Sequence, residues 1–290
     1  MIEVSTCVIC DQPIKRLKKA LVAPFVAKRI WAKKPFPIDL VGCDGCGFRF
    51  YNPRLDDSEL AREYNNFRSR EYFEMRHSFE PWFTEKFNEE LGSPSSYQHR
   101  RELLAPIFRR ILVDRTIRRV LDYGGDQGGL VKGLFDDAEL FVYEVSGVDT
   151  LPGVTAVHDP AQCRPDLIVN SNVLEHVGFP RELTSAMVKA APVGGLVFIE
   201  VPCEEAFGVS RLARRIAQIA ILALRTPKLI PSLFCPEALY MMHEHINYFK
   251  PHCLNQLVQS CGAKIVASGT YPYSSKVGGA EMAWCLGEKA

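Results

Sequence analysis

The segment that most constrains the fold is residues 119–130, RVLDYGGDQGGL. Its first five residues have the apolar and β-branched character of a short strand, a glycine-rich turn follows, and the start of a helix is expected after the turn. A strand, a glycine-rich turn and a helix in this order form the corner of a Rossmann-like sheet that receives a nucleotide cofactor. The segment therefore predicts an α/β fold with an adenosine-containing cofactor at this turn.

Two carboxylates narrow the choice of cofactor. The glycines Gly124, Gly125 and Gly128 do not complete a GxGxxG motif, and Asp122 and Asp126 lie in or beside the turn. The pyrophosphate of a dinucleotide would meet both negative charges. S-adenosylmethionine carries an ammonium and a sulfonium group, so the turn favours this cofactor. The predicted cofactor contacts in the segment are Asp122, Tyr123, Gly124, Gly125 and Gly128.

Downstream of this turn, segments of strand character alternate with segments of helical character, which predicts a mainly parallel sheet. Strands are expected at residues 119–123, 140–145, 154–158, 166–170, 196–201, 264–267 and 280–286, and helices at 181–191 and 252–261. Upstream, apolar residues recur three or four positions apart, which predicts helices. The predicted organisation is a small zinc-binding module at 1–55, a helical segment on the substrate side at 56–115, and a cofactor-binding domain at 116–290 with an insertion at 204–240.

Two CxxC pairs stand in the first 50 residues. The pairs are Cys7 with Cys10 and Cys43 with Cys46, separated by 32 residues. Each pair can present two thiolates to one tetrahedral zinc ion, and the nearby glycines permit a tight turn. The chain has ten cysteines and no secretory signal, so we expect a reducing, cytoplasmic location and a structural zinc rather than disulfides. Incidental reduced thiols are the alternative interpretation.

The composition excludes a general attraction to polyanions. The formal net charge is +1, and the hydrophobic content of 47% is that of an ordinary soluble protein, so neither nucleic acid nor an anionic membrane is favoured by charge alone. The insertion at residues 204–240 is different, because it mixes arginines with an apolar stripe. It is interpreted as a substrate lid, a packed helix or homodimer face, or an interfacial helix that contacts a membrane or a lipid-linked acceptor, with the last least favoured.

Polar residues follow the predicted strands. Glu144 ends the second strand, 22 residues after Asp122, where a carboxylate can accept hydrogen bonds from both ribose hydroxyls. Asp159 follows the third strand and is a weaker candidate for the adenine amino group, since Asp before Pro is also a turn signal. Asn170 stands at the tip of the fourth strand, where doubly wound sheets bind their ligands.

Two further groups suggest acid–base chemistry. Asn172 and His176 are four residues apart, so a helical turn would put them on one face, with His176 orienting the acceptor or taking a proton. A histidine that satisfies backbone groups at a helix start is an equally weighted alternative. Glu244 and His245 lie side by side in MHEHINYF, and a carboxylate beside an imidazole raises its basicity. A polar loop that supports the fifth strand is the alternative for this pair.

Together these motifs resemble the class I S-adenosylmethionine-dependent methyltransferases. LDYGGDQG resembles the first motif of that family, with Asp126 at the place of a glycine, and YEVSG resembles its acidic second motif. DLIVNSNVLEHV, APVGGLVFIEVP and HEHINYFKPHCLNQLVQSCGAKIV resemble the fourth-strand motif, the turn into the fifth strand and the closing block. The resemblance covers residues 117–290. It implies a Rossmann-like sheet whose last strand is antiparallel, and methyl transfer from S-adenosylmethionine.

The amino-terminal half is similar to that of the zinc-containing sugar methyltransferases of deoxysugar biosynthesis. This resemblance implies a nucleotide-linked sugar or glycan precursor as acceptor, methylated on carbon or oxygen. The family's Asn and His after the fourth strand match Asn172 and His176, and its Glu–His dyad matches Glu244 and His245, with the histidine as base. Two residues are candidates for a tyrosine that lines the family's pocket, Tyr64 and Tyr72. The alternatives are an RNA or other small-molecule methyltransferase, and a methyltransferase-like binding protein without turnover.

Overall fold

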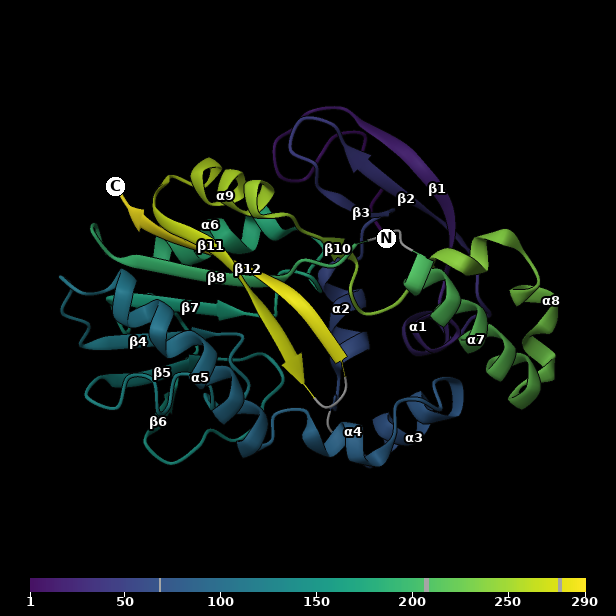
Figure 1. The fold of residues 1–290 in the computed structure, drawn as a ribbon, viewed down its shortest axis with the longest axis horizontal. Helices are drawn as coiled ribbons and strands as arrows, with labels where there is room; N and C mark the ends of the chain where they lie inside the picture. Colours follow the sequence, from purple (N-terminus) through teal and green to yellow (C-terminus); the bar gives the residue numbers. More distant parts are fainter. Residues whose placement is uncertain (68, 206–208, 276–277) are drawn as a thin grey trace. The chain divides into compact units, whose positions relative to one another are not determined.

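The computed structural model describes residues 1–67, 69–205, 209–275 and 278–290 (Figure 1). Part of the predicted insertion, residues 206–208, lies outside the described residues. The chain divides into two compact units. Unit 1 comprises Met1–Asn88, Glu175–Phe179 and Glu204–Tyr248, and unit 2 comprises Glu89–Leu174, Pro180–Cys203 and Phe249–Ala290. Each unit has a β-sheet and a hydrophobic core of its own.

Unit 2 contains the predicted cofactor-binding sheet. Its seven strands have the order β11-β12-β8-β7-β4-β5-β6. Strands β4 to β8 are parallel to their neighbours, and β12 is antiparallel to β8, so the predicted Rossmann-like sheet with an antiparallel last strand is confirmed. The strands are β4 (Arg119–Tyr123), β5 (Glu139–Tyr143), β6 (Val154–Ala156), β7 (Leu167–Ser171), β8 (Leu196–Pro202), β11 (Ala263–Ser275) and β12 (Gly278–Lys289).

Three helices accompany this sheet: α5 (Pro94–Ile111), α6 (Pro180–Ala190) and α9 (Pro251–Ser260). Helix α5 begins at Ser93, whose hydroxyl accepts a hydrogen bond from the N–H of Ser96 (3.1 Å) and so satisfies a free helix-end donor. Phe108 of α5 packs against Phe198 of β8, with ring centroids 4.6 Å apart. Apolar side chains of α5 and of the sheet thus share one core.

The helix expected directly after β4 is wrong. Residues 124–138, all of which the structure describes, form turns. The backbone has positive φ at Gly124, Asp126, Gly128 and Gly133, and left-handed residues interrupt a right-handed helix. The glycines that marked the turn also extend it, so the chain reaches β5 without an intervening helix.

Strand β11 is longer than the expected strand at 264–267. Pro272 and Gly269 discourage a strand prediction, because proline lacks a ladder donor and glycine lacks a side chain to pack. β11 is the edge strand of the sheet, where a missing N–H is tolerated. A Cβ atom on Gly269 would lie 3.0 Å from the ring of Trp284 on β12, so this glycine lets the indole pack across the strand pair.

Unit 1 is built on a five-stranded sheet with the order β10-β3-β2-β1-β9. Its strands are β1 (Ile14–Val22), β2 (Pro37–Cys43), β3 (Arg49–Asn52), β9 (Met241–Met242) and β10 (Asn247–Tyr248). Its α-helices are α1 (Pro24–Trp31), α2 (Asp57–Tyr64), α3 (Arg70–Phe79), α4 (Glu85–Glu90, which ends in unit 2), α7 (Val209–Arg225) and α8 (Ile230–Leu233). Two short 3-10 helices span Pro227–Leu229 and Pro236–Tyr240.

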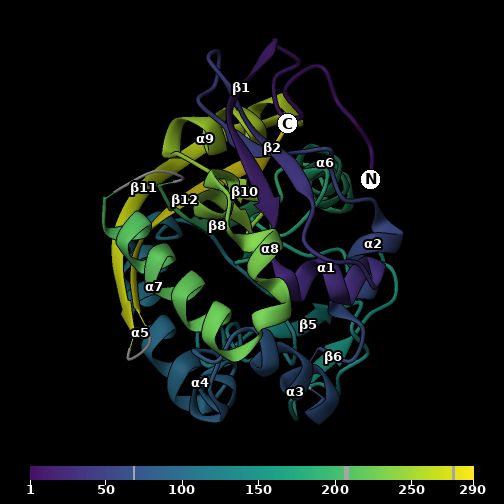
Figure 2. The ribbon, with the colours of Figure 1, turned by 90° about the vertical axis from the view of Figure 1, so that its right-hand side faces the viewer.

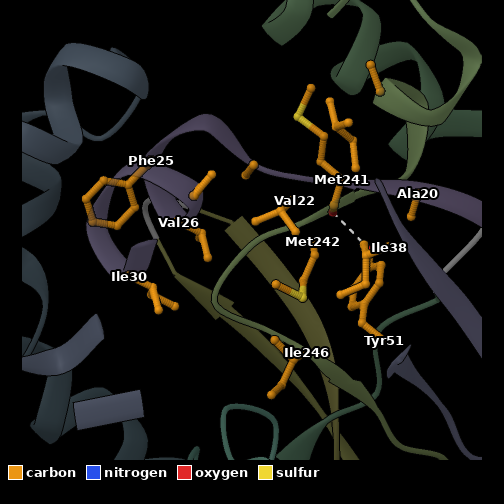
Figure 3. Close-up of a cluster of buried hydrophobic side chains, with 14 of the residues drawn as sticks. Ala20, Val22, Phe25, Val26, Ile30, Ile38, Tyr51, Met241, Met242 and Ile246 are labelled. Carbon is orange, nitrogen blue, oxygen red and sulfur yellow. Dashed lines mark hydrogen bonds between the residues drawn. The ribbon is translucent and has the colours of Figure 1, made fainter. Parts of the chain in front are cut away.

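The core of unit 1 joins the amino-terminal strands to residues far along the chain. Val22 and Phe25 pack in one cluster with Met242 and Ile246 (Figure 3). The hydroxyl of Tyr51 donates to the backbone oxygen of Met241 (2.9 Å), the contact drawn in the same view. Strand β9 pairs in parallel with β1. Residues 241–248 are therefore part of the amino-terminal sheet, although the sequence places them next to the cofactor-binding strands.

Candidate active site

The glycine-rich turn of unit 2 follows β4 directly. The N–H of Gly124 donates to the backbone oxygen of Tyr143 (2.8 Å), which holds the turn against β5. A Cβ atom on Gly125 would lie 2.1 Å from Cγ of Asp122, and Gly128 has a φ of +77°, so neither position accepts a larger residue without rearrangement. The turn brings its backbone close to the carboxyl group of Asp122.

Three carboxylates gather at this turn. One oxygen of Glu144 accepts a hydrogen bond from the N–H of Asp126 (3.0 Å), and the other accepts from the N–H of Ser146 (2.9 Å). The side chain of Asp126 accepts a hydrogen bond from Tyr97 (3.0 Å). Asp126 has a φ of +54°, a left-handed conformation that aspartate tolerates better than most residues. This explains how an aspartate can replace the motif glycine at this position.

Asp122 is the buried member of the three. Its side chain is 1% exposed, and its Oδ2 accepts no hydrogen bond from the part of the chain that the structure describes. Burial raises the pKa of Asp122 to about 7, the charges of Glu144 and Asp126 add to the rise, and Arg100 opposes it. A carboxyl group that ionises near neutral pH among other carboxylates is suited to a cationic ligand.

The remaining predicted cofactor residues lie at strand ends. Asn170 is buried on β7 and donates through Nδ2 to the backbone oxygen of Tyr123 (2.8 Å), which ties β7 to β4. The rings of Tyr123 and Tyr143 pack with centroids 4.8 Å apart. Asp159 accepts a hydrogen bond from the N–H of Ala161 (3.0 Å), the local turn contact that was the alternative for this residue.

A buried ion pair that the sequence does not signal lies at the ends of β7 and β8. Glu200 is fully buried and accepts hydrogen bonds from Arg100 of α5 and from the hydroxyl of Tyr271 on β11 (2.6 Å). Arg100 also donates to the hydroxyl of Ser171, the last residue of β7. Burial lowers the pKa of the Arg100 guanidinium, but the charge and hydrogen bond of Glu200 outweigh the effect of burial, so the pKa is raised. The pair therefore fixes the tip of β7.

In unit 1, two histidines and a glutamate converge. The side-chain donor atoms of Glu175, His176 and His245 lie within 4.8 Å of one another. The two imidazole rings meet edge to face, with centroids 4.7 Å apart. Arg54 holds the segment of Glu175 and His176 in unit 1, because its buried guanidinium donates to the backbone oxygen of Gly178 (2.7 Å). The geometry thus joins a residue after β7 to a residue between β9 and β10.

The two imidazoles have opposite protonation preferences. Nδ1 of His245 is hydrogen-bonded to Oε1 of Glu204 (3.0 Å). Burial disfavours the imidazolium, but the hydrogen bond and charge of Glu204 outweigh it and raise the pKa of His245 to about 9. Burial and the charge of His245 lower the pKa of His176 to about 3. His245 can therefore exchange a proton through Nε2, whereas His176 stays neutral.

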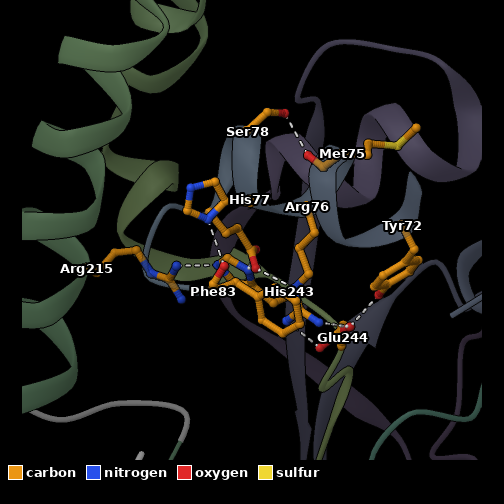
Figure 4. A network of polar contacts seen from close by, with 10 residues as sticks. Tyr72, Met75, Arg76, His77, Ser78, Phe83, Arg215, His243 and Glu244 are labelled. Carbon is orange, nitrogen blue, oxygen red and sulfur yellow. Dashed lines mark hydrogen bonds and ion pairs between the residues drawn. The ribbon is translucent and has the colours of Figure 1, made fainter. Parts of the chain in front are cut away.

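The expected pairing of Glu244 with His245 needs correction. Both oxygens of Glu244 accept hydrogen bonds from Arg76 (2.6 and 2.7 Å), and Oε1 also accepts one from Tyr72 (2.9 Å), as Figure 4 shows. The adjacent His243 is hydrogen-bonded to Glu80 (2.8 Å). Glu244 contributes its charge to His245 but not a hydrogen bond, because its lone pairs are directed at the guanidinium of α3.

Both candidate tyrosines enter this group of polar side chains. The hydroxyl of Tyr64 is hydrogen-bonded to Nδ1 of His176 (2.8 Å), and that of Tyr72 donates to Glu244. Nδ1 of His176 also contacts the backbone oxygen of Glu244 (3.1 Å), so Nδ1 carries the proton and Nε2 the lone pair. Because both tyrosine hydroxyls contact this group, the choice between Tyr64 and Tyr72 as the pocket tyrosine stays open.

The helical turn expected to pair Asn172 with His176 is wrong. Residues 172–178, all described, form bends and turns, and Asn172 has a φ of +55°. The N–H of Asn172 donates to the backbone oxygen of Glu200 (3.1 Å) in unit 2, whereas His176 belongs to unit 1. The spacing of four residues consequently carries no information here.

Glu204 is the site residue that sequence reasoning missed. It lies two residues beyond β8, which ends at Pro202, and it is the carboxylate that His245 contacts. A polar side chain just after the carboxyl end of a parallel strand is a signal that could have singled it out. Its partner is 41 residues away, so the pairing itself was not visible in the sequence.

The four predicted zinc ligands meet at one point in unit 1. Sγ of Cys7 lies 3.6 Å from that of Cys46, and Sγ of Cys10 lies 3.5 Å from that of Cys43, with all four within 4.8 Å of one another. Zinc–sulfur bonds of about 2.3 Å in a tetrahedron place sulfurs about 3.8 Å apart. The cluster therefore fits a closed four-thiolate site, which leaves no open position for catalysis.

The fold of the chain is similar to that of 1,6-didemethyltoxoflavin-N1-methyltransferase from Burkholderia thailandensis, solved with 1,6-didemethyltoxoflavin and S-adenosylhomocysteine. The TM-score is 0.50 at 12% identity, over 87% of this chain and 96% of that one. Magnesium protoporphyrin IX methyltransferase from Synechocystis PCC 6803, solved with S-adenosylhomocysteine, gives a TM-score of 0.41 at 14% identity, over 66% and 84%. No curated protein matches the sequence. The first likeness shows a class I methyltransferase fold. The family described as a methyltransferase domain matches residues 97–268, more than half of the chain, and the protein belongs to that family.

Proposed function

We propose that the protein transfers the methyl group of S-adenosylmethionine to a small, sugar-type acceptor. The observation that carries the choice of donor is the group of three carboxylates at the turn after β4, Asp122, Asp126 and Glu144, in a domain of the methyltransferase family. We assign the ribose hydroxyls to Glu144, and its place directly after β5 supports this assignment. S-adenosylmethionine supplies the methyl group on a sulfonium centre, whose positive charge these carboxylates favour.

Binding of S-adenosylmethionine is expected to tighten as the pH rises through about 7. The reason is that Asp122, whose pKa is raised to about 7, becomes negative and attracts the cationic cofactor. The dissociation constant measured by calorimetry should fall several-fold between about pH 6 and about pH 8, by the Coulomb attraction of one added charge. Asp122→Asn should remove this dependence, while Asp137→Asn, a change at an exposed carboxylate, should leave it intact. A wild-type affinity that is flat over this range would contradict the role of Asp122.

Proton removal from the acceptor is assigned to His245. Nε2 of His245 takes the proton from an acceptor hydroxyl, or from a carbon beside a carbonyl, while Nδ1–H stays hydrogen-bonded to Glu204. The methyl group moves to the acceptor oxygen or carbon, and the donor leaves as a neutral thioether, so charge and atoms balance. Neutral His176 and the hydroxyl of Tyr64 lie in the same group and are suited to orienting the acceptor.

The sugar-type acceptor rests on the resemblance of the amino-terminal half and on the polar groups of unit 1. Hydroxyl, carboxylate and guanidinium groups of Tyr72, Glu244 and Arg76 suit a hydroxyl-rich molecule. The test is release of S-adenosylhomocysteine with nucleotide-linked keto sugars, simple sugars and RNA as alternative acceptors. Turnover with sugar nucleotides supports the proposal, and turnover with RNA alone refutes the acceptor class. Binding of S-adenosylmethionine without turnover on any acceptor would favour a non-catalytic binding protein.

We also propose that Cys7, Cys10, Cys43 and Cys46 hold one structural zinc ion. Their convergence and burial support this assignment. Desolvation, with a hydrogen bond to Cys43 adding to it, raises the pKa of Cys10 to about 11, so the Cys10 thiol ionises readily only with a cation beside it. The location proposed with this site is a reducing, cytoplasmic compartment, where thiolate ligands persist and disulfides are rare.

A further inference from the structure

Helix α7 and the segment after it expose an unusual amount of apolar surface. Exposed apolar side chains of α7 include Ile216 (54% exposed) and Leu224 (82% exposed), and Leu212 and Ile221 are exposed as well. Phe234, just after α8, is 90% exposed. Contiguous exposed apolar side chains of this size mark interaction surfaces in proteins. We call this set, together with Ile230, the outer face of α7–α8.

The apolar side chains of the outer face are distinct from those with which this segment packs into the core of unit 1. Leu222, Leu229 and Leu233 are buried in the core of unit 1, and Ile219 packs against the same cluster. Some apolar side chains of α7 are therefore held by the core of its own unit, while others are exposed. Figure 2 shows α7 and α8 as successive helical segments joined by a sharp bend. The core contacts of Leu222, Leu229 and Leu233 anchor this segment to unit 1.

The charges of this segment have one sign. Residues 209–234 contain Arg211, Arg214, Arg215, Arg225 and Lys228 and no acidic residue, although the whole chain has a net charge of only +1. Arg214, Arg225 and Lys228 are exposed. Arginine and lysine beside an exposed apolar helix face are the pattern of helices that lie in the interface of an anionic bilayer. The positive charge of the exposed arginines and lysine favours an anionic partner, and the exposed apolar side chains favour a partner with a hydrocarbon interior.

The segment is suited to lying on a bilayer rather than crossing one. Within the described residues, no single helix is long and apolar enough to cross a membrane. One bent pair of helices, Leu212–Arg225 with Pro227–Leu233, has the length and composition of a membrane span only when the two parts are taken together. The two parts of the pair meet at 119°. The buried side chains of Leu222, Leu229 and Leu233 occupy the core of unit 1, so lipid cannot surround these helices.

We propose that the outer face of α7–α8 docks the protein on an anionic lipid bilayer, with the apolar side chains among the acyl chains and the cations at the headgroups. The proposal is independent of the identity of the acceptor. A second copy of the chain is the competing occupant of an apolar face, and it is distinguished because a protein contact does not require anionic lipid.

The experiment is flotation of the full-length protein with vesicles of phosphatidylcholine, with and without phosphatidylglycerol. We expect binding only with phosphatidylglycerol and its loss at high salt, which screens the exposed cations. Leu224→Glu combined with Phe234→Glu should weaken binding by about tenfold or more, because two apolar contacts are lost and charge is reversed. Val113→Glu is the matched control, since Val113 is also exposed (76%) but lies in unit 2.

Three measurements keep the result unambiguous. Circular dichroism and affinity for S-adenosylmethionine should be unchanged in the double variant, so a loss of vesicle binding cannot be ascribed to unfolding or to loss of the cofactor site. Light scattering should show that wild type and double variant have the same mass in solution. No binding to anionic vesicles, or equal binding to neutral ones, would overturn the proposal. A wild-type dimer that the double variant dissociates would assign the face to a second copy.

Discussion

Replacing Cys43 with Ser is expected to abolish zinc binding and to unfold the amino-terminal sheet of unit 1. Cys43 is the buried last residue of β2, and the turn that follows it carries Cys46. In the proposed site, one zinc ion held by both CxxC pairs would tie the first ten residues to the β2–β3 hairpin. Loss of a structural metal is among the changes that cost more than about 4 kcal/mol of unfolding free energy. Zinc content by atomic emission and amide hydrogen exchange of residues 14–52 measure the two effects.

The matched control is Cys235→Ser. Cys235 also lies in unit 1, but it contacts the backbone oxygen of Ser232 (3.6 Å) rather than the thiol cluster. This variant should retain one zinc per chain and normal hydrogen exchange. Unit 2 has its own core, so its protection should persist in Cys43→Ser. Wild-type protein purified without zinc, or Cys43→Ser with a full equivalent, would contradict the structural site. The donor atoms of Glu175, His176 and His245 also lie close together. A second equivalent of zinc retained by wild type would therefore argue against a purely acid–base role for His245.

Local signals were sufficient for the sheet of unit 2 and for the cofactor turn. Strand β4 occupies the predicted residues, and Glu144 and Asp126 meet through one hydrogen bond although 18 residues separate them. These features depend on short apolar, β-branched runs and on glycine, which act over a few residues. The thiol cluster was visible for a related reason, since two residues of rare type at a metal-binding spacing restrict the partners to each other.

Pairings across the chain could not be predicted in the same way. The carboxylate hydrogen-bonded to His245 is Glu204 rather than its neighbour Glu244, because Arg76 of α3 occupies both oxygens of Glu244. That competition depends on where a helix 168 residues upstream is packed. The prediction of a helix after β4 failed because residues in the left-handed conformation continue beyond the glycine motif. For His245, tertiary geometry that is absent from any local window decided the outcome, whereas after β4 the backbone conformation of the turn itself did.

Replacing His245 with Asn is expected to lower kcat by about 10²–10⁴ while leaving the affinity for S-adenosylmethionine unchanged, the range typical of lost general-base catalysis. With a pKa raised to about 9, His245 is neutral in only about one molecule in a hundred at pH 7, so wild-type turnover should climb with pH toward about 9. Glu204→Gln removes the charge that opposes burial, so the pKa of His245 should fall and the rising limb should move by about one unit or more to lower pH.

The position of that limb separates proton transfer from mere support of the fold. Glu205→Gln is the matched control, because Glu205 is adjacent but exposed and paired with Arg49 (3.5 Å), so its removal should leave the limb in place. His176 has a pKa lowered to about 3 and does not titrate between about pH 6 and about pH 10, so His176→Asn should reduce turnover without shifting the limb. A limb that stays fixed in Glu204→Gln, or turnover of His245→Asn within a few-fold of wild type, would place the base elsewhere. The imidazole of Glu204→Gln is also a weaker base, so the turnover plateau of this variant at high pH should be lower than that of wild type. The activity of Glu204→Gln relative to wild type should therefore rise as the pH falls, and a loss of folded protein cannot reproduce this trend.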